Sequence, residues 1–169
     1  MASPRKIVLG AAVVATLGAC GADKPAPQPD RLANVDWPRF LAHCPIGEAL
    51  GYGMKIDEVV KGEVTGDGFP DTLIVDSCES PTASNPQTVE IFDGNSDPAA
   101  PRKLGILMAK DPDYPRRMKV TVSPDRRIVV KALGLQPESP RCCPDLEIVA
   151  EFAWRDGAFV SVNRQTKPV

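Results

Sequence analysis

Apolar and polar residues alternate along much of the chain, and this pattern predicts β-strands. The clearest case is residues 146–154, where every second residue from Leu146 to Trp154 is apolar and two glutamates lie between them. Asp156-Gly157 follows as a hairpin turn, and residues 158–162 form the next expected strand. A strand with one apolar face needs a second layer to cover it, so this segment predicts a packed sheet.

The middle of the chain carries the same signature in shorter segments. Residues 71–78 include the continuous apolar run Leu73-Ile74-Val75, which indicates a buried strand. Further strands are expected at residues 56–62, 88–92, 103–109, 118–122 and 127–133. About eight short strands with short turns predict a mainly β fold, an antiparallel meander that forms a small sandwich or a curved sheet.

One short helix is expected near the N-terminus, at residues 35–43. Asp36 can cap it, Pro38 fits its first turn, and Cys44-Pro45 can end it. Longer helices are not expected, because the chain contains 18 prolines.

Charge and composition narrow the classes of partner. The net charge is −2, and it becomes about −4 without the basic residues of the first segment, so nucleic acid is not an expected partner. We interpret the basic pairs Arg116-Arg117 and Arg126-Arg127 as solvated flanks of turns and not as a phosphate site.

The first 20 residues have the pattern of an export signal. Arg5 and Lys6 precede an apolar stretch at residues 7–17, which is too short to span a bilayer. Leu17-Gly18-Ala19-Cys20 follows and resembles the lipobox of bacterial lipoproteins. This resemblance implies cleavage before Cys20, a diacylglyceryl group on its thiol with further acylation such as palmitate, and anchoring to the outer face of the cell membrane. The alternative is an ordinary secretory signal that contains a cysteine.

Three regions are therefore predicted. Residues 1–19 form a lipoprotein signal peptide, residues 20–31 a lipid-anchored linker rich in proline, and residues 32–169 a single extracytoplasmic β domain.

Four cysteines remain after lipidation of Cys20, and an even number in an exported domain predicts two disulfides. Of the three possible pairings, we favour the two that join Cys142 and Cys143 separately to Cys44 and Cys78. The third pairing links the two neighbours and requires a distorted eight-membered ring. A zinc site is not expected, because the chain has no Cys-x-x-Cys and only one histidine.

One loop, residues 63–71, carries oxygen-bearing residues at alternate positions around Gly68. Calcium binds six to eight oxygens, and a tight loop can supply them from every second residue. The candidate calcium ligands are the side chains of Glu63, Thr65, Asp67 and Asp71 and the carbonyl of Phe69. The competing interpretation is a turn whose acids bind backbone amides.

Two resemblances follow from these motifs. Thr65 to Leu73 is similar to the acidic calcium loop of FG-GAP and VCBS repeats, although that family has Asp at position 63 and Asp or Asn at position 65. The lipobox, the acidic loop, the strand ending at Cys78 and the Cys142-Cys143 pair together resemble actinobacterial lipoproteins of the LppP/LprE type. This second resemblance implies a cell-envelope location and two disulfides, without an activity.

No motif indicates an enzyme. His43 is the only histidine, and the chain lacks a nucleophile elbow and a phosphate-binding glycine loop. We expect a non-enzymatic binding or accessory module of the cell envelope, attached to the membrane by its lipid and recognising an envelope protein or a cell-wall ligand. The alternatives are a calcium-dependent adhesion module, a two-carboxylate hydrolase, and a structural envelope protein.

Overall fold

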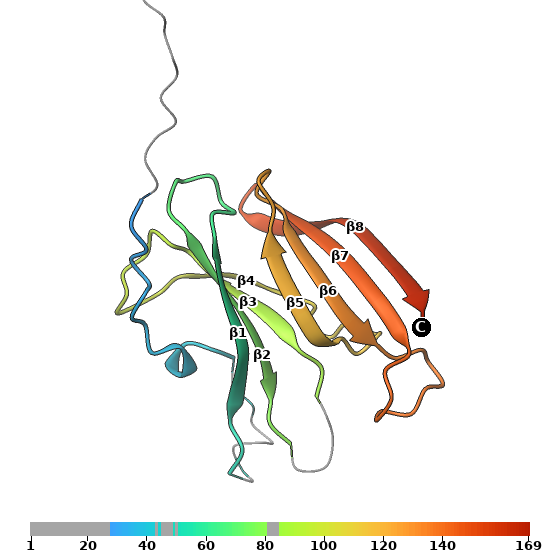
Figure 1. Ribbon diagram of the computed structural model, residues 1–169. Coiled ribbons are helices and arrows are strands. Elements are labelled where there is room, and N and C mark those ends of the chain that lie inside the picture. Colours follow the sequence, from blue (N-terminus) through green and yellow to red (C-terminus); the bar gives the residue numbers. More distant parts are fainter. Residues whose placement is uncertain (1–27, 43, 45–48, 50, 81–84) are drawn as a thin grey trace, which may run out of the picture.

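Two four-stranded antiparallel sheets face each other across a shared apolar core (Figure 1). The computed structural model describes residues 28–42, 44, 49, 51–80 and 85–169. The predicted export signal, Cys20 and His43 lie outside these residues. The expected fold class, mainly β with antiparallel strands in a sandwich, is confirmed.

Each sheet is a simple meander in which consecutive strands pair. The first sheet consists of β1 (Met54–Gly62), β2 (Asp71–Cys78), β3 (Thr88–Phe92) and β4 (Lys103–Leu107). The second consists of β5 (Arg116–Val122), β6 (Ile128–Gly134), β7 (Leu146–Arg155) and β8 (Ala158–Pro168). Most predicted strands differ from these by a few residues, but β8 runs well past residue 162 because it pairs with all of β7.

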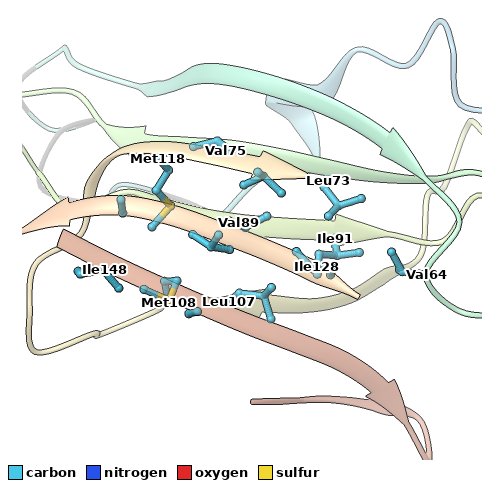
Figure 2. Packing of buried hydrophobic residues seen from close by; sticks show 14 of the residues in the cluster. Val64, Leu73, Val75, Val89, Ile91, Leu107, Met108, Met118, Ile128 and Ile148 are labelled. Carbon is cyan, nitrogen blue, oxygen red and sulfur yellow. The ribbon is translucent and has the colours of Figure 1, made fainter. Parts of the chain in front are cut away.

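The core between the sheets is made by the alternating apolar residues that the sequence pattern identifies (Figure 2). Leu73 and Val75 of β2 meet Ile128 and Val130 of β6, and all four side chains are fully or almost fully buried. Each fully buried aliphatic side chain contributes about 1.5–3 kcal/mol to folding, so this layer is the main source of stability.

The outer face of the first sheet is also covered, by an extended segment of residues 30–42 that we name the N-terminal strap. Its residues Leu32, Trp37 and Leu41 pack against Ile74 and Phe92. The rings of Trp37 and Phe92 are 4.9 Å apart. β2 is therefore buried on both faces, which explains why its apolar residues form a continuous run and do not alternate.

The predicted helix at residues 35–43 is wrong in extent. Residues 35–42 contain one 3-10 turn, η1 (Trp37–Arg39), with Pro38 in its first turn as expected. Asp36 makes no capping hydrogen bond and instead forms an ion pair with Arg39 at 2.8 Å. A segment this short gains more from packing its aromatic and aliphatic side chains on the sheet than from helical hydrogen bonds.

Contacts between the strap and the sheet begin at Asp30. The ammonium of Lys61 lies 3.0 Å from the Asp30 carboxylate. Arg31 donates a 2.9 Å hydrogen bond to the Asn95 side chain. The packed part of the chain thus includes two residues assigned to the linker. No helix in the described residues is long and apolar enough to cross a membrane.

Candidate functional site

A groove of about 570 Å³ opens at one end of the sandwich, where β1 and β2 meet β5. Lys55, Asp57 and Glu58 of β1 line one side, and residues 116–119 of β5 line the other. The loop with Cys142 and Pro144 completes the wall. This end of the first sheet is where Met54 pairs with Cys78, opposite the acidic loop that joins Gly62 to Asp71.

Arg116 is the most unusual residue of the groove, because it occupies a core-facing position of β5. Burial alternates along this strand, so that Arg116 lies on the same face as Met118 and Val120, which belong to the apolar core. Arg116 is only 5% exposed. The interpretation of Arg116-Arg117 as a solvated turn flank is therefore wrong for Arg116. The alternation of buried and exposed residues in β5 begins at Arg116. The predicted strand began at residue 118, so the prediction did not place Arg116 on the core face.

The guanidinium of Arg116 has few protein partners. Its Nη1 donates to the main-chain carbonyl of Arg141, and its carbon lies 5.5 Å from the centre of the Tyr114 ring. Nε and Nη2 are buried and have no hydrogen-bond acceptor among the described residues. Among the described residues, no carboxylate forms an ion pair with Arg116, so no direct contact with them neutralises its positive charge. A buried charge without a partner is costly, by several kcal/mol.

A β-bulge sets the direction of this side chain. The pairing of β5 with β6 shifts between Arg116 and Lys119, and Arg117 has a φ of 50°. Such a left-handed conformation is uncommon for a residue other than glycine, and bulges often re-aim a side chain beside a binding site. Arg117 itself is exposed at the groove.

Gln87 connects the two walls of the groove. Its side-chain N–H donates to Asp57 of β1 at 2.6 Å, and its side-chain carbonyl accepts from the amide of Met118 in β5 at 2.7 Å. Its own amide donates to the carbonyl of Pro115 at 2.8 Å. Three hydrogen bonds from one residue thus hold the sheets at a fixed separation beside Arg116. Nothing in the sequence pattern marked Gln87, since it precedes β3 in a polar loop.

Two of the acidic residues that line the groove, Asp57 and Glu58, lie beside lysines. Lys55 is 2.7 Å from Asp57, which raises the pKa of Lys55. Burial alone would raise the pKa of Asp57, but hydrogen bonds from Lys55 and Gln87 outweigh it and lower that pKa below its usual value. Lys119 lies 3.7 Å from Oε2 of Glu58, too far for a hydrogen bond, so this buried oxygen has an ion-pair partner without a hydrogen-bond donor.

The acidic loop does not come near the groove, and its carboxylates bind backbone amides. Asp71 is fully buried, and its Oδ2 accepts from the amides of Val64 and Thr65 at 2.9 and 3.1 Å. Its Oδ1 accepts from the amide of Gly94 at 2.9 Å. Burial raises the pKa of Asp71, and these three amide donors partly offset it. An alanine at position 94 would place its Cβ 2.2 Å from the Pro70 carbonyl, so glycine is required for this contact.

The remaining calcium candidates behave in the same way. Glu63 accepts from the amide of Gly66 and pairs with Arg126 at 3.8 Å. Asp67 accepts from the amide of Phe69 at 2.9 Å, and Thr65 donates to Asp71 at 3.3 Å. No cluster of three or more His, Cys, Asp or Glu side chains in the described part of the chain is placed to hold a metal ion. The geometry supports the turn interpretation of the loop, and calcium binding stays a prediction.

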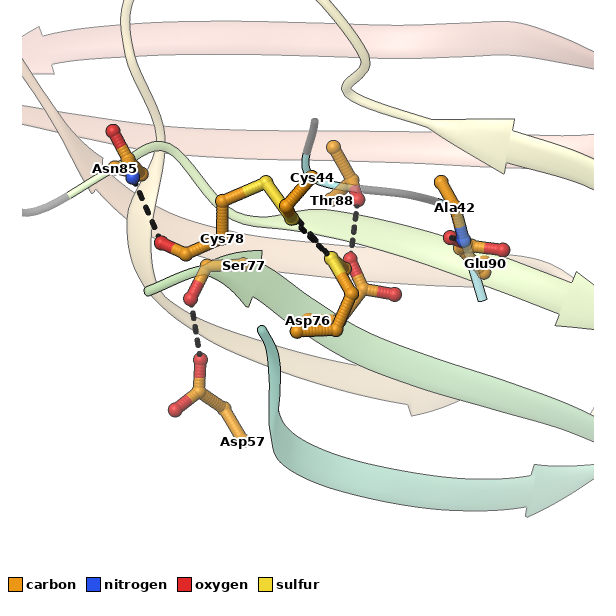
Figure 3. Close-up of a disulfide and its surroundings, with 10 residues drawn as sticks. Ala42, Cys44, Asp57, Asp76, Ser77, Cys78, Asn85, Thr88 and Glu90 are labelled. Carbon is orange, nitrogen blue, oxygen red and sulfur yellow. Dashed lines mark hydrogen bonds between the residues drawn. A yellow bond between two sulfur atoms is a disulfide. The ribbon is translucent and has the colours of Figure 1, made fainter. Parts of the chain in front are cut away.

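The four cysteines form two pairs, but not the favoured ones. Cys44 is bonded to Cys78 with 5.7 Å between their Cα atoms, and Cys142 is bonded to its neighbour Cys143 (Figure 3). The expectation that the adjacent pair joins Cys44 and Cys78 is corrected. The strap brings Cys44 onto the outer face of β2, beside Cys78, whereas Cys142 and Cys143 lie in the loop before β7.

The sequence pattern did not mark two buried carboxylates on the outer face of the first sheet, Asp76 and Glu90. Asp76 accepts from the Thr88 hydroxyl at 2.7 Å, and burial raises its pKa to about 7. Glu90 accepts from the Ala42 amide at 2.6 Å and pairs with the Lys103 ammonium. Figure 3 shows Asp76 beside the Cys44–Cys78 disulfide and Glu90 farther along the sheet, next to Ala42. Glu90 thus fastens the strap to the sheet.

Comparison with known proteins gives no function for the groove or the acidic loop. No protein-family model, no curated protein and no solved structure matches the chain. A function for this chain therefore has to be inferred from its own residues and their arrangement.

Proposed function

We propose that this chain is a bacterial lipoprotein whose β-sandwich is a non-enzymatic binding module of the cell envelope, with the groove between β1 and β5 as its ligand site. The observation that carries the proposal is Arg116, a buried guanidinium at the groove with two nitrogens that lack a protein acceptor. An unpaired buried charge lowers the stability of the folded protein. Residues that lower stability in this way are expected at functional sites.

Lipid anchoring is supported by the sequence. Arg5 and Lys6, the apolar stretch and Leu17-Gly18-Ala19-Cys20 have the order that lipid modification and cleavage require. The Cys44–Cys78 disulfide is of the kind found in proteins of an oxidising compartment outside the cytoplasm.

The position of the groove fits a tethered receptor. Arg31 contacts Phe69 and Asn95, so the strap reaches the first sheet at the end that carries the acidic loop. The groove lies at the other end of β1, and nine residues of strand span about 27 Å. A tether attached at residue 28 would therefore hold the groove farther from the membrane than the acidic loop.

Binding is favoured over catalysis by the state of the groove acids. Hydrogen bonds from Lys55 and Gln87 lower the pKa of Asp57, which makes it a poor general acid at neutral pH, and Glu58 forms an ion pair with Lys119. Asp111 and Asp113 are likewise held, by Arg164 at 2.9 and 2.6 Å. These pairs make the two-carboxylate hydrolase the weaker proposal.

Metabolic labelling tests the anchor. Cells that express the whole chain are fed a clickable palmitate analogue, and the protein is purified and probed for the label. The wild-type protein should be labelled and sediment with membranes, and the Cys20→Ala variant should be unlabelled. Equal labelling of both proteins would remove Cys20 as the lipid site, and no label on either would leave an ordinary secretory signal.

Site-specific cross-linking tests the groove in intact cells. A photoreactive amino acid replaces Lys119, an exposed residue at the groove, or Arg155, an exposed residue at the opposite end of the second sheet. A discrete adduct should form from position 119 alone, and Lys55→Trp, which fills the groove from its rim, should abolish it. The same adducts from both positions, or none from position 119, would contradict a ligand site in the groove.

A further inference from the structure

We propose that the groove binds a carboxylate group of its ligand through Arg116, an inference that rests on the groove being the ligand site. Nε and Nη2 form one edge of the guanidinium, and both are without a protein acceptor in the described chain. Two parallel N–H donors on such an edge match the two oxygens of a carboxylate. A single lysine ammonium could not offer this geometry.

Other contacts hold the guanidinium in place. Its Nη1 donates to the Arg141 carbonyl, and the Tyr114 ring lies 5.5 Å from its central carbon. The guanidinium of Arg141 lies 4.7 Å from the same ring, which fixes the position of Tyr114. A side chain held in this way loses little conformational entropy when a ligand arrives. The bulge at Arg117 and the hydrogen bond from the Met118 amide to Gln87 fix the backbone of β5 next to Arg116.

The charges of the groove favour one negative charge on the ligand. Among the described residues, four cationic and three anionic side chains line it. Lys55 is paired with Asp57 and Lys119 with Glu58, which leaves Arg116 and Arg117 facing a single further acid, Glu79. A carboxylate neutralises the remaining positive charge, whereas a phosphate near neutral pH brings close to two negative charges. A monoanion is therefore the better match.

An internal partner is the competing arrangement. Glu58 also lines the groove, and its buried Oε2 lacks a hydrogen-bond donor. A rotation of Glu58 toward Arg116 would pair the two within the protein and leave no place for a ligand carboxylate. The two arrangements predict different effects on the melting temperature when anions are added and when Arg116 is replaced by an uncharged residue.

The test uses the mature lipidated chain in detergent, in a buffer free of carboxylate and phosphate. Its melting temperature is followed with sodium acetate, with inorganic phosphate, and with sodium chloride at matched ionic strength. Acetate should raise the melting temperature with half-maximal effect at millimolar concentration, and chloride should not. Arg116→Met should weaken the acetate response at least tenfold. Arg126→Gln removes the same charge near the acidic loop and should leave the response unchanged.

Three results would overturn the proposal. A flat acetate response in wild-type protein excludes carboxylate binding, and an equal or stronger response to phosphate excludes the preference for a monoanion. An acetate response in Arg116→Met as strong as that of wild-type protein excludes Arg116 as the anion-binding group. If Arg116→Met fails to fold, Arg116→Lys keeps the charge without the paired donors and should show the weakened acetate response.

Failure here and failure of the proposed function are distinguishable. Cross-linking from position 119 without an acetate response would keep the groove as a ligand site and remove only the carboxylate. Absence of the groove-specific cross-link would contradict both the groove as a ligand site and the carboxylate as its ligand group.

Discussion

Met118 lies in β5 of the second sheet and Gln87 in the loop before β3 of the first, and the Met118 amide donates a 2.7 Å hydrogen bond to the Gln87 side-chain carbonyl. The other end of the same carboxamide reaches Asp57, 2.6 Å away in the first sheet. The separation of β1 and β5 at the groove is thus set by a side chain that belongs to neither strand. This contact links the packing of the sandwich to the geometry of the candidate site.

Replacing Gln87 by alanine should destabilise the protein by about 1–3 kcal/mol, because the Met118 amide loses its acceptor. The variant should also weaken the acetate response, since Arg116 lies two residues before Met118. Urea denaturation and the acetate melts measure the two effects. Gln165→Ala, at an exposed position of β8, is the matched control and should change neither. A Gln87→Ala variant with wild-type stability would show that the carboxamide does not hold the sheets.

Asp76 should make stability depend on pH. Its pKa is raised to about 7 in the folded protein, from the ordinary value of 3.8. Between these values the folded state keeps a proton that the unfolded state has released, so stability falls as pH rises from about 4 to 7 and is level above. The total loss is on the order of 4 kcal/mol.

Asp76→Asn tests this dependence, because an amide keeps the shape of the protonated acid. Urea midpoints measured from pH 4.5 to 8 should fall for wild-type protein and stay nearly level for the variant. Asp125→Asn, at an exposed turn whose aspartate pKa is lowered by Ser123, should keep the wild-type slope. An Asp76→Asn profile parallel to that of wild-type protein would assign the pH dependence to other groups.

The Cys44–Cys78 disulfide should matter far more than the Cys142–Cys143 pair. The first closes a loop with a sequence separation of 34, and the second closes none. Chain entropy predicts a loss of about 4 kcal/mol for the Cys44→Ser/Cys78→Ser double variant and little for Cys142→Ser/Cys143→Ser. Urea denaturation measures both. Mass spectrometry of the non-reduced digest should link the Cys44 and Cys78 peptides, and a link from either to the Cys142-Cys143 peptide would refute this pairing.

Asp71 is predicted to be a structural residue whether or not calcium is present. Asp71→Ala removes the acceptor of three buried or partly buried amides and should cost about 2–4 kcal/mol in chelator. Asp67→Ala removes one exposed contact and should cost less than about 1 kcal/mol. Thermal melts in calcium and in chelator measure both variants. A calcium-dependent rise of the wild-type melting temperature that both variants lose would instead establish the loop as a calcium site.

The strand pattern of the sequence was sufficient for most of the fold. β2 and β3 match the predicted residues 71–78 and 88–92 at both ends, because turn residues bound their apolar runs clearly. The strap was mistaken for a helix, since its apolar residues owe their spacing to the outer face of the sheet. The sequence pattern does not show that Ile74 and Phe92 form an apolar outer face of the first sheet that another segment must cover.

The candidate site was much less predictable. The sequence drew attention to the acidic loop, where residue types resemble metal ligands, but burial directs Asp71 to backbone amides. Arg116 looked like surface charge because two adjacent arginines usually are, and only the register of β5 places the first of them on the core face. Gln87 depends on contacts between sheets, which no local pattern contains.

The most direct test of the central claim is the side-chain NMR signal of Arg116. The Nε–H cross-peak is identified as the one absent from the spectrum of Arg116→Met, and it is followed while acetate is added to the wild-type protein. The account predicts that this peak moves progressively and saturates, because the carboxylate accepts directly from Nε, while the Arg126 peak stays in place. An Arg116 peak that does not move at saturating acetate would contradict the claim that this buried guanidinium is the anion-binding group of the groove.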